Sequence, residues 1–259
     1  MLQFTTTQIL RISSSINLTL AFFNHEFFNC MSIKKIALIV AGGNGTRMNS
    51  DIPKQFLLLK NKPVLYYSIK TFLEAYDDME IILVLPQEHI GKGREIIDGY
   101  FDASKFKITA GGRTRFHSVQ NGLSLVTGEE EAIIFVHDGV RCLLTTKLVE
   151  RCYDAALQVG TAVPAVACND SVRLLIPNGN KILNRNKVRL VQTPQTFHSK
   201  ILLPAYAIDY KDQFTDEATV VEAFGLKVNL IEGEIDNIKI TTPADLFLAE
   251  FIRESQQQF

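Results

Sequence analysis

The chain has 259 residues, a length that fits one large α/β domain or two small ones. Its hydrophobic fraction of 46% and charged fraction of 21% allow a sizeable core, which excludes global disorder and fibrous repeats. The 27 basic and 28 acidic residues give a formal charge of −1, which excludes a general basic surface for nucleic acid.

The first thirty residues differ in composition from the rest. Among many Thr, Ser, Asn and Phe residues they hold two full charges, Arg11 and Glu26. The interrupted apolar stretch 16–23 is shorter than the roughly 20 residues that cross a bilayer, so we expect no membrane segment. Signal-peptide features are missing, and a transit peptide, which stays an alternative, would need more arginines. We expect residues 1–31 to be an N-terminal extension outside the fold, with Met31 as a natural start.

After Met31, short apolar runs alternate with segments of helical spacing. In chain order, the sequence predicts strands at 36–40, 81–85, 106–109, 132–136, 162–167 and 227–232, and helices at 63–75, 88–100, 116–125, 148–159, 215–224 and 243–253. Such alternation is typical of an α/β fold with a doubly wound parallel sheet and helices on both faces. We expect residues 32–259 to form a single domain.

Residues 170–191 break this alternation. Two strand-like runs flank Pro177-Asn178-Gly179-Asn180, and an Asn-Gly turn between apolar runs predicts a β-hairpin. Because the hairpin is inserted in a parallel α/β unit, we expect it to project as an arm over residues 169–192. On a monomer the arm would expose Val172, Leu174, Ile176 and Ile182, which is unfavourable for a soluble protein.

The first strand runs into a glycine-rich segment, Ala41-Gly42-Gly43-Asn44-Gly45-Thr46-Arg47-Met48, followed by Pro53-Lys54-Gln55-Phe56. Glycines let backbone N–H groups approach a phosphate, and open α/β sheets bind ligands at the carboxyl ends of their strands. The segment is neither a Walker A loop nor a dinucleotide fingerprint, because neither spacing is complete. Two cations in fixed register, Arg47 and Lys54, fit a triphosphate attacked at phosphorus. Alternatively, Arg47 pairs with Asp51 on the surface.

These two segments closely resemble the signature of nucleotidyltransferases that activate phosphorylated sugars and polyols. Four further blocks narrow the resemblance to the 2-C-methyl-D-erythritol 4-phosphate cytidylyltransferase family, of the non-mevalonate isoprenoid pathway. They lie in the family's order and spacing at 111–119, 136–141, 215–218 and 232–241. The resemblance covers residues 35–253 and implies a Rossmann-like three-layer αβα nucleotidyltransferase domain.

The resemblance implies a transferase in which the phosphate of methylerythritol phosphate attacks the α-phosphorus of CTP, and pyrophosphate leaves. There is no covalent intermediate, so positioning and charge stabilisation carry the catalysis. By the family pattern, Arg47 and Lys54 stabilise the transition state, and Lys239 and Arg185 hold the acceptor phosphate. Because Lys54 is expected to lie in a loop, we expect it to contribute nothing to the packing of the core, so that its replacement would leave the fold intact.

The same resemblance implies that Mg²⁺ bridges the triphosphate, with Asp138 and Asp236 as the carboxylates near it. Arg141 and Ser171 match pocket and acceptor-side positions, although serine stands where threonine is common. Another departure is Arg113, where an acidic residue is frequent. The groups expected to bind CTP belong to Ala41, Gly42, Gly43, Gly45, Gly111, Gly112, Ser118 and Asp138.

In the resembled family the arms interlock across a two-fold axis. We therefore expect a homodimer through the 169–192 arm, with Ser171 and Arg185 acting in the partner's site. The four cysteines form no CxxC pair and have no histidine at zinc-ligand spacing, which predicts a reduced, cytoplasmic protein.

Alternatives remain at two levels. A ribitol 5-phosphate cytidylyltransferase would have a nearly identical loop, although the 215–218 block and Asp236-Asn-Ile-Lys239 favour methylerythritol phosphate. An inactive regulatory subunit would be expected to lose the loop cations or carboxylates, which are all present. At single residues, Asp138 and Asp216 could be helix N-caps, and His137 fits a structural role better than that of a base.

Overall fold

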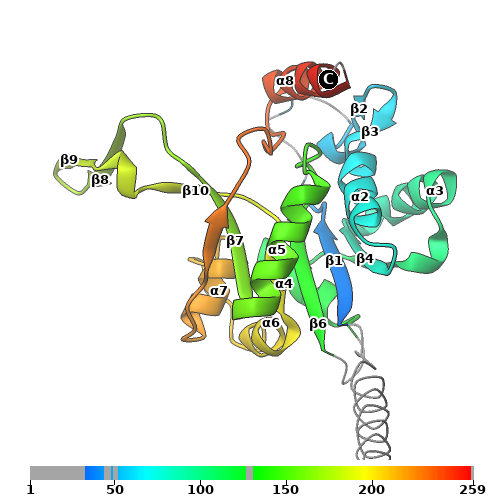
Figure 1. Cartoon of the computed structure of the whole chain (residues 1–259), viewed down its shortest axis with the longest axis horizontal. Coiled ribbons are helices and arrows are strands. Elements are labelled where there is room, and N and C mark those ends of the chain that lie inside the picture. The colour runs from blue at the N-terminus through cyan, green and yellow to red at the C-terminus, as the bar shows by residue number, and fades with distance from the viewer. Residues whose placement is uncertain (1–32, 44–47, 49–51, 127–130, 258–259) are drawn as a thin grey trace, which may run out of the picture. The chain divides into compact units, whose positions relative to one another are not determined.

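The computed structural model describes residues 33–43, 48, 52–126 and 131–257, and every helix and strand in it belongs to the unit Lys34–Phe259 (Figure 1). The predicted extension 1–31 lies outside the described residues. Within the described part of the chain, no helix is both long and apolar enough to cross a membrane.

A central sheet organises the domain, with the strand order β10-β7-β11-β6-β1-β4-β5 and with β12 also paired to β7. The carboxyl ends of its middle strands are level, because Val40 is in register with both Val84 and Asp138. A ligand at this edge therefore meets residues from several strands at once. The strands are β1 (Lys34–Val40), β4 (Met79–Leu85), β5 (Phe106–Ala110), β6 (Ala132–Asp138), β7 (Thr161–Ala167), β10 (Arg189–Val191), β11 (Gln195–His198) and β12 (Leu230–Glu232).

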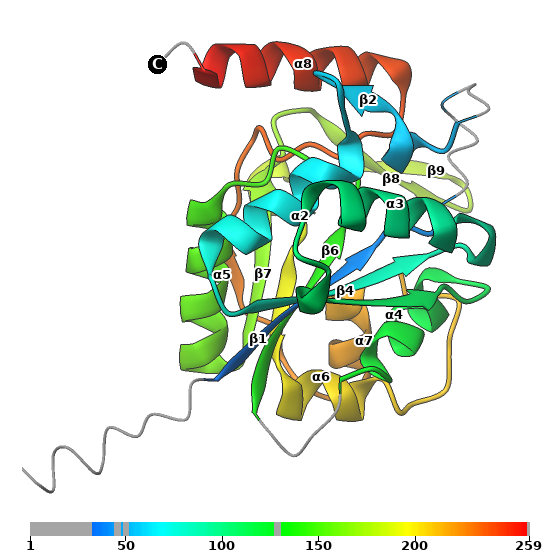
Figure 2. The same cartoon turned by 90° about the vertical axis from the view of Figure 1, so that its right-hand side faces the viewer.

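Helices cover both faces of the sheet, as predicted, and give three layers (Figure 2). One face packs against α4 (Arg115–Leu123), α6 (Ser199–Ala205) and α7 (Glu217–Ala223), which share a buried cluster with Ile36 and Leu38 of β1. The other face carries α2 (Val64–Ala75), α3 (Ile90–Tyr100) and α5 (Thr146–Val159). On that face the ring of Phe72 in α2 meets Phe135 of β6 with centroids 5.6 Å apart.

Burial on both faces explains why the middle strands are continuous apolar runs. Successive side chains of a strand point to opposite faces, so Ile36 and Leu38 face one helical layer while Ala37 and Ile39 face the other. All four are at most 2% exposed. The Rossmann-like three-layer αβα fold expected from the sequence is therefore confirmed.

A second apolar cluster lies over the carboxyl edge. The C-terminal helix α8 (Pro243–Gln257) packs there with the short strands β2 (Leu58–Leu59) and β3 (Lys62–Pro63), through Ala249 and Leu59 among others. The Arg253 guanidinium stacks over the Tyr67 ring at 3.9 Å and donates to the Cys142 carbonyl at 3.2 Å. These contacts support the loops that form the edge.

Two strands of the central sheet that were not predicted from the sequence run against the parallel strands. β10 runs antiparallel to β7, and β11 runs antiparallel to both β6 and β7. The physical reason is the point of re-entry, since the chain leaves β7 at the carboxyl edge and returns to the sheet from that same edge. A strand that starts there must run against its neighbours.

The predicted hairpin is present and projects from the domain (Figure 1). It consists of β8 (Val172–Ile176) and β9 (Gly179–Leu183), joined by the two residues Pro177 and Asn178, with Gly179 at a φ of +132° as the first residue of β9. The turn thus lies one residue earlier than an Asn-Gly turn. The end of the predicted 169–192 arm, β10, pairs with the central sheet.

The described residues include three free cysteines. Cys142 and Cys152 are buried, and burial raises the pKa of each thiol to about 12. Cys168 is partly exposed. The two buried thiols are therefore protonated and have a packing role.

Candidate active site

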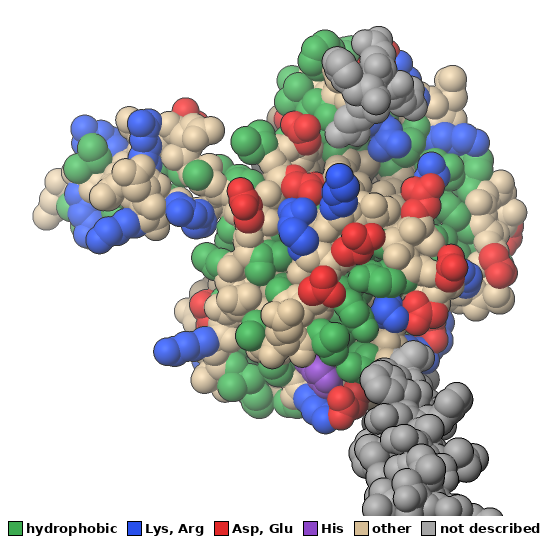
Figure 3. Space-filling model, viewed as in Figure 1, with side chains coloured by type: hydrophobic (Ala, Val, Ile, Leu, Met, Phe, Trp, Pro, Cys, Tyr) green, Lys and Arg blue, Asp and Glu red, His purple; other side chains and the backbone are tan. Residues whose placement is uncertain are grey.

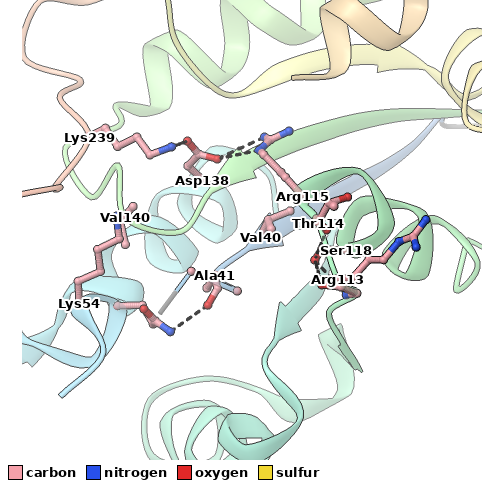
Figure 4. Close-up of a pocket in the computed structure, with 14 residues that line it drawn as sticks. Val40, Ala41, Lys54, Arg113, Thr114, Arg115, Ser118, Asp138, Val140 and Lys239 are labelled. Carbon is pink, nitrogen blue, oxygen red and sulfur yellow. Dashed lines mark hydrogen bonds and ion pairs between the residues drawn. The ribbon is translucent and has the colours of Figure 1, made fainter. Parts of the chain in front are cut away.

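A pocket of about 270 Å³ opens at the carboxyl edge of the sheet (Figure 4). Its walls are the residues after β1, the residues between β5 and α4, the 3₁₀ turn η2 (Lys54–Phe56), Asp138 at the end of β6, and Lys239. These five segments come from four parts of the sequence, around 40–55, 112–118, 138–140 and 239. Each part contains residues for which the sequence predicts a role in substrate or metal binding or in catalysis.

One wall is built from backbone and small side chains. The Ser118 hydroxyl accepts from the Gly112 N–H at 3.1 Å and lies 2.9 Å from the Thr114 carbonyl, to which it donates. A Cβ on Gly111 would lie 3.0 Å from the same hydroxyl oxygen, so a side chain there would crowd this contact. Across the pocket, the Gln55 amide donates to the Ala41 carbonyl at 2.9 Å.

The pocket contains most of the predicted CTP-binding residues. Ala41, Gly42, Gly43, Gly112 and Ser118 line the pocket, and Gly111 lies against Ser118. Backbone groups and small side chains at the pocket wall suit a flat base whose edge carries hydrogen-bonding atoms. The predicted binding residue Gly45 lies outside the described residues, as does the predicted catalytic residue Arg47.

Lys54 lines the pocket but is only 9% exposed. Its ammonium donates to the Ile240 carbonyl at 3.0 Å, across 186 positions of the chain. The expectation that Lys54 contributes nothing to the packing of the core is therefore wrong. Its side chain is buried, and its ammonium connects η2 to the segment after Lys239. The same contact gives the ammonium a defined position.

Asp138 is the centre of the charge in the pocket. Its Oδ1 lies 3.2 Å from Arg115 Nη2, and its Oδ2 lies 2.7 Å from Lys239 Nζ (Figure 4). The same Oδ2 lies 4.0 Å from Arg141 Nε. Burial alone would raise the pKa of this carboxyl, but Arg115, Lys239 and Arg141 outweigh burial and hold the pKa well below its usual range. Asp138 is thus an anion at any working pH.

The position of Lys239 depends on a hydrogen-bonded loop. The buried Asn237 donates from its amide to the Thr193 carbonyl at 2.9 Å, and its own carbonyl accepts from Arg141 at 2.8 Å. The Ile240 N–H then donates to the Val140 carbonyl at 3.0 Å. Arg141, a predicted binding residue, lies behind Asp138 in this structure and anchors the loop.

Two other residues have the structural roles considered from the sequence. His137 is fully buried between Thr193 and the Arg141 carbonyl, and burial lowers its pKa to about 3, so the ring is neutral. Asp216 caps α7 by accepting from the Thr219 N–H at 3.0 Å. Both observations agree with leaving these side chains out of catalysis.

Three predicted site residues lie apart from the pocket within this chain. Arg185 and Ser171 are exposed on the arm, where Arg185 donates to the Asn169 carbonyl at 2.6 Å. Arg185 also lines a separate pocket of about 300 Å³ at the base of the arm. Asp236 is exposed in the turn before Lys239 and is absent from the described lining of the main pocket.

Sequence reasoning missed two residues of the site, Arg115 and Glu217. Arg115 forms ion pairs with both Asp138 and Glu217, and the Glu217 side chain is 0% exposed. Both residues lie in blocks that carry the family resemblance, 111–119 and 215–218, but no role was predicted for either of them. Their separation of 102 positions hid the pair. A glutamate directly after an N-cap aspartate, at the start of an apolar helix, was the available signal.

The donor set fits a magnesium ion that arrives with a nucleotide. Among the described residues there is no group of three Asp, Glu, His or Cys side chains able to hold a metal by themselves. Mg²⁺ commonly uses one or two protein carboxylates and completes its shell with substrate phosphates and water. The ionised Asp138 at the pocket wall meets that requirement.

Comparison with known proteins decides the family. The family model described as 2-C-methyl-D-erythritol 4-phosphate cytidylyltransferase matches residues 35–255. The chain belongs to this family. A family member with that name from Phocaeicola vulgatus is 45% identical over 215 residues, which are 83% of this chain and 97% of the relative. Its namesake from Clostridium perfringens is 38% identical, over 84% of this chain and 97% of the relative.

Solved structures agree with the family assignment. The 4-diphosphocytidyl-2C-methyl-D-erythritol synthase of Anaerococcus prevotii superposes with a TM-score of 0.73 at 26% identity, over 86% of this chain and 99% of that one. The bifunctional enzyme of Campylobacter jejuni gives 0.69 at 29% identity, over 83% of this chain and 53% of that one. The resemblance drawn from the sequence blocks is thus confirmed across the domain.

Proposed function

We infer that the chain transfers the cytidylyl group of CTP to 2-C-methyl-D-erythritol 4-phosphate, giving 4-diphosphocytidyl-2-C-methyl-D-erythritol and pyrophosphate in non-mevalonate isoprenoid precursor synthesis. The observation that carries this is the ionised Asp138 held between Arg115 and Lys239, beside a glycine-lined wall and Lys54. Membership of the family favours this acceptor over ribitol 5-phosphate. The intact cations and carboxylate also argue against an inactive regulatory subunit.

The chemistry that these residues perform is positioning and charge balance. The α-phosphate of CTP carries negative charge that increases on its oxygens during attack. Cations fixed nearby stabilise this charge. We assign this role to Lys54, whose ammonium is already held against the Ile240 carbonyl, and to Arg47. We assign binding of the acceptor phosphate to Lys239. Its side chain is 40% exposed, and its ammonium can leave the Asp138 carboxylate to bind a phosphate oxygen.

For the metal we propose Mg²⁺, with Asp138 and Asp236 as the protein carboxylates near it. Such an ion would neutralise triphosphate charge and make pyrophosphate a better leaving group. The role of the protein is then to present an ionised, oriented carboxylate. Arg115 does this by donating from Nε and Nη2 to the same Asp138 oxygen, at 3.4 and 3.2 Å.

We propose a homodimer in the cytoplasm in which each arm completes the partner's acceptor site. The arm residues 169–192 include five basic side chains and one acidic one, and blue side chains gather on the projecting arm in Figure 3. Leu175 and Ile182 on the hairpin are 81% and 70% exposed. An arm with apolar and cationic surface suits docking on a second copy that binds anionic substrates.

The reaction is tested by pyrophosphate release from CTP and Mg²⁺, with 2-C-methyl-D-erythritol 4-phosphate and ribitol 5-phosphate in parallel. We expect strong preference for the first acceptor. Preference for ribitol 5-phosphate would keep the cytidylyl transfer but overturn the acceptor. Inactivity with both acceptors would contradict the inference that the chain catalyses cytidylyl transfer.

The shared site is tested by mixing two variants, Arg185→Met and Asp138→Asn, each expected to be nearly inactive. After subunit exchange, half of the dimers are mixed, and each mixed dimer has one site with both native residues. We therefore expect recovery of about a quarter of the wild-type rate. The control is each variant exchanged with itself. If the mixture gains no activity although mass spectrometry shows mixed dimers, Arg185 does not act in the partner's site.

A further inference from the structure

Four side chains form a row of alternating charge from the interior to the pocket. Glu217 in α7 contacts Arg115 at the start of α4, Arg115 contacts Asp138 at the end of β6, and Asp138 contacts Lys239. Figure 4 shows the outer part of this row, with Arg115 and Lys239 on either side of Asp138. The side chain at the inner end, Glu217, is 0% exposed, and the one at the outer end, Lys239, is 40% exposed.

We propose that Glu217 is a positioning residue for cytidylyl transfer, which acts by holding the Arg115 guanidinium in the orientation that fixes Asp138. The proposal rests on the function proposed above. Glu217 lies outside the pocket lining among the described residues, so its influence on substrate has to pass through Arg115.

The contacts of Arg115 explain why an anchor is needed. One face of its guanidinium fork, Nε and Nη2, donates to Asp138 Oδ1, and Nη1 donates to Glu217 Oε1. An arginine with a single carboxylate partner can rotate about that partner, whereas two partners on different elements define the plane of the guanidinium. The orientation of Asp138 thus depends on a carboxylate buried behind it.

Glu217 itself is held from two directions. The Tyr206 hydroxyl donates to Glu217 Oε1 at 3.1 Å. Gln195 of β11 fixes the first turn of α7, because its amide donates to Asp216 Oδ2 at 2.9 Å and its carbonyl oxygen accepts from the Ala218 N–H at 2.8 Å. The anchor therefore belongs to the rigid interior between β11, α6 and α7.

Stability alone does not account for a carboxylate in this place. Burial raises the pKa of Glu217 against the opposing effect of Arg115, and its second oxygen, Oε2, is buried without a hydrogen-bond partner among the described atoms. Replacing buried ion pairs by apolar side chains is often neutral or stabilising. A buried carboxylate with an unpaired oxygen, directly behind the charged pocket, is instead expected where a site needs orientation.

The test is the isosteric substitution Glu217→Gln, with Glu222→Gln on the exposed side of the same helix as the matched control. We expect E217Q to lower kcat by at least about tenfold, with the KM for CTP changed less than threefold, because an orienting contact acts on the transition state more than on binding. E222Q should keep wild-type constants. Thermal unfolding of each variant shows whether the rates refer to folded protein.

A double-mutant cycle separates positioning from simple structural support. If Glu217 acts through Arg115, adding E217Q to Arg115→Met lowers kcat no further. Equal tenfold losses in both backgrounds, or a wild-type kcat for E217Q, would overturn the proposal while the proposed reaction stands. If E217Q fails to fold, Tyr206→Phe replaces it in the same cycle, with a smaller loss expected only when Arg115 is present. An inactive wild type would overturn both the reaction and this proposal.

Discussion

Replacing Lys54 by methionine is expected to lower kcat by about 100- to 1,000-fold, the range found when one preorganised transition-state donor is removed. The ammonium is fixed against the Ile240 carbonyl at 3.0 Å and lines the pocket, so it can stabilise developing charge without reorganising. Methionine keeps the packed aliphatic stem and removes only the charge. The measurement is steady-state pyrophosphate release.

The same substitution has a measurable cost in stability. The buried Ile240 carbonyl loses its donor, and an unsatisfied buried acceptor costs about 1–3 kcal/mol in the free energy of unfolding. Lys92→Met, at an exposed lysine whose described ion pair is with Glu95, is the control and should change neither quantity. A K54M enzyme with wild-type kcat would remove Lys54 from the mechanism, whatever its stability.

Replacing Asp138 by asparagine is the second large effect, with kcat expected to fall by about 100-fold or more. Asparagine keeps the shape but removes the charge that holds Lys239 and Arg115. The depressed pKa of Asp138 also means that its carboxylate contributes stability above its unfolded pKa of about 3.9, and that this is lost as pH falls through the folded pKa. D138N should therefore be less stable than wild type at pH 7.

A magnesium titration of activity distinguishes the two assigned carboxylates. D138N should need more Mg²⁺ for half of its own maximal rate, and Asp236→Asn should show the same change without loss of stability, since Asp236 is exposed. An unchanged magnesium requirement in both variants would contradict the metal assignment. A change in D138N alone would leave Asp138 as the protein carboxylate near the metal.

The sequence predicted best what depends on local pattern. Buried strands such as β1 are continuous apolar runs, and glycines mark the ends that form the pocket, so the sequence predicts both features. The direction of a strand was predictable only where a helix connects it to the preceding strand. β11 runs the other way because of where the chain re-enters after the arm, and no periodicity records that.

The residues of the site likewise divide into those that local pattern predicts and those that depend on distant contacts. Residues in named blocks, such as Ser118 and Asp138, do meet in one pocket. The burial of Lys54 and the pairing of Arg115 with Glu217 depend on contacts spanning more than one hundred positions, which spacing along the chain cannot report. Arg185 and Ser171 lie apart from that pocket within one chain, so the role that we propose for them requires a second copy.

The Ile240 peptide has a consequence for the dynamics of the site. Its N–H is held by the Val140 carbonyl and its carbonyl by the Lys54 ammonium, next to Lys239. Local opening of this short segment would break the Ile240 contact of Lys54 and displace the backbone next to Lys239 at the same time, so the surroundings of two of the site's cations would change as one unit. The rate at which the Ile240 amide exchanges its hydrogen for deuterium would then measure how often this segment opens.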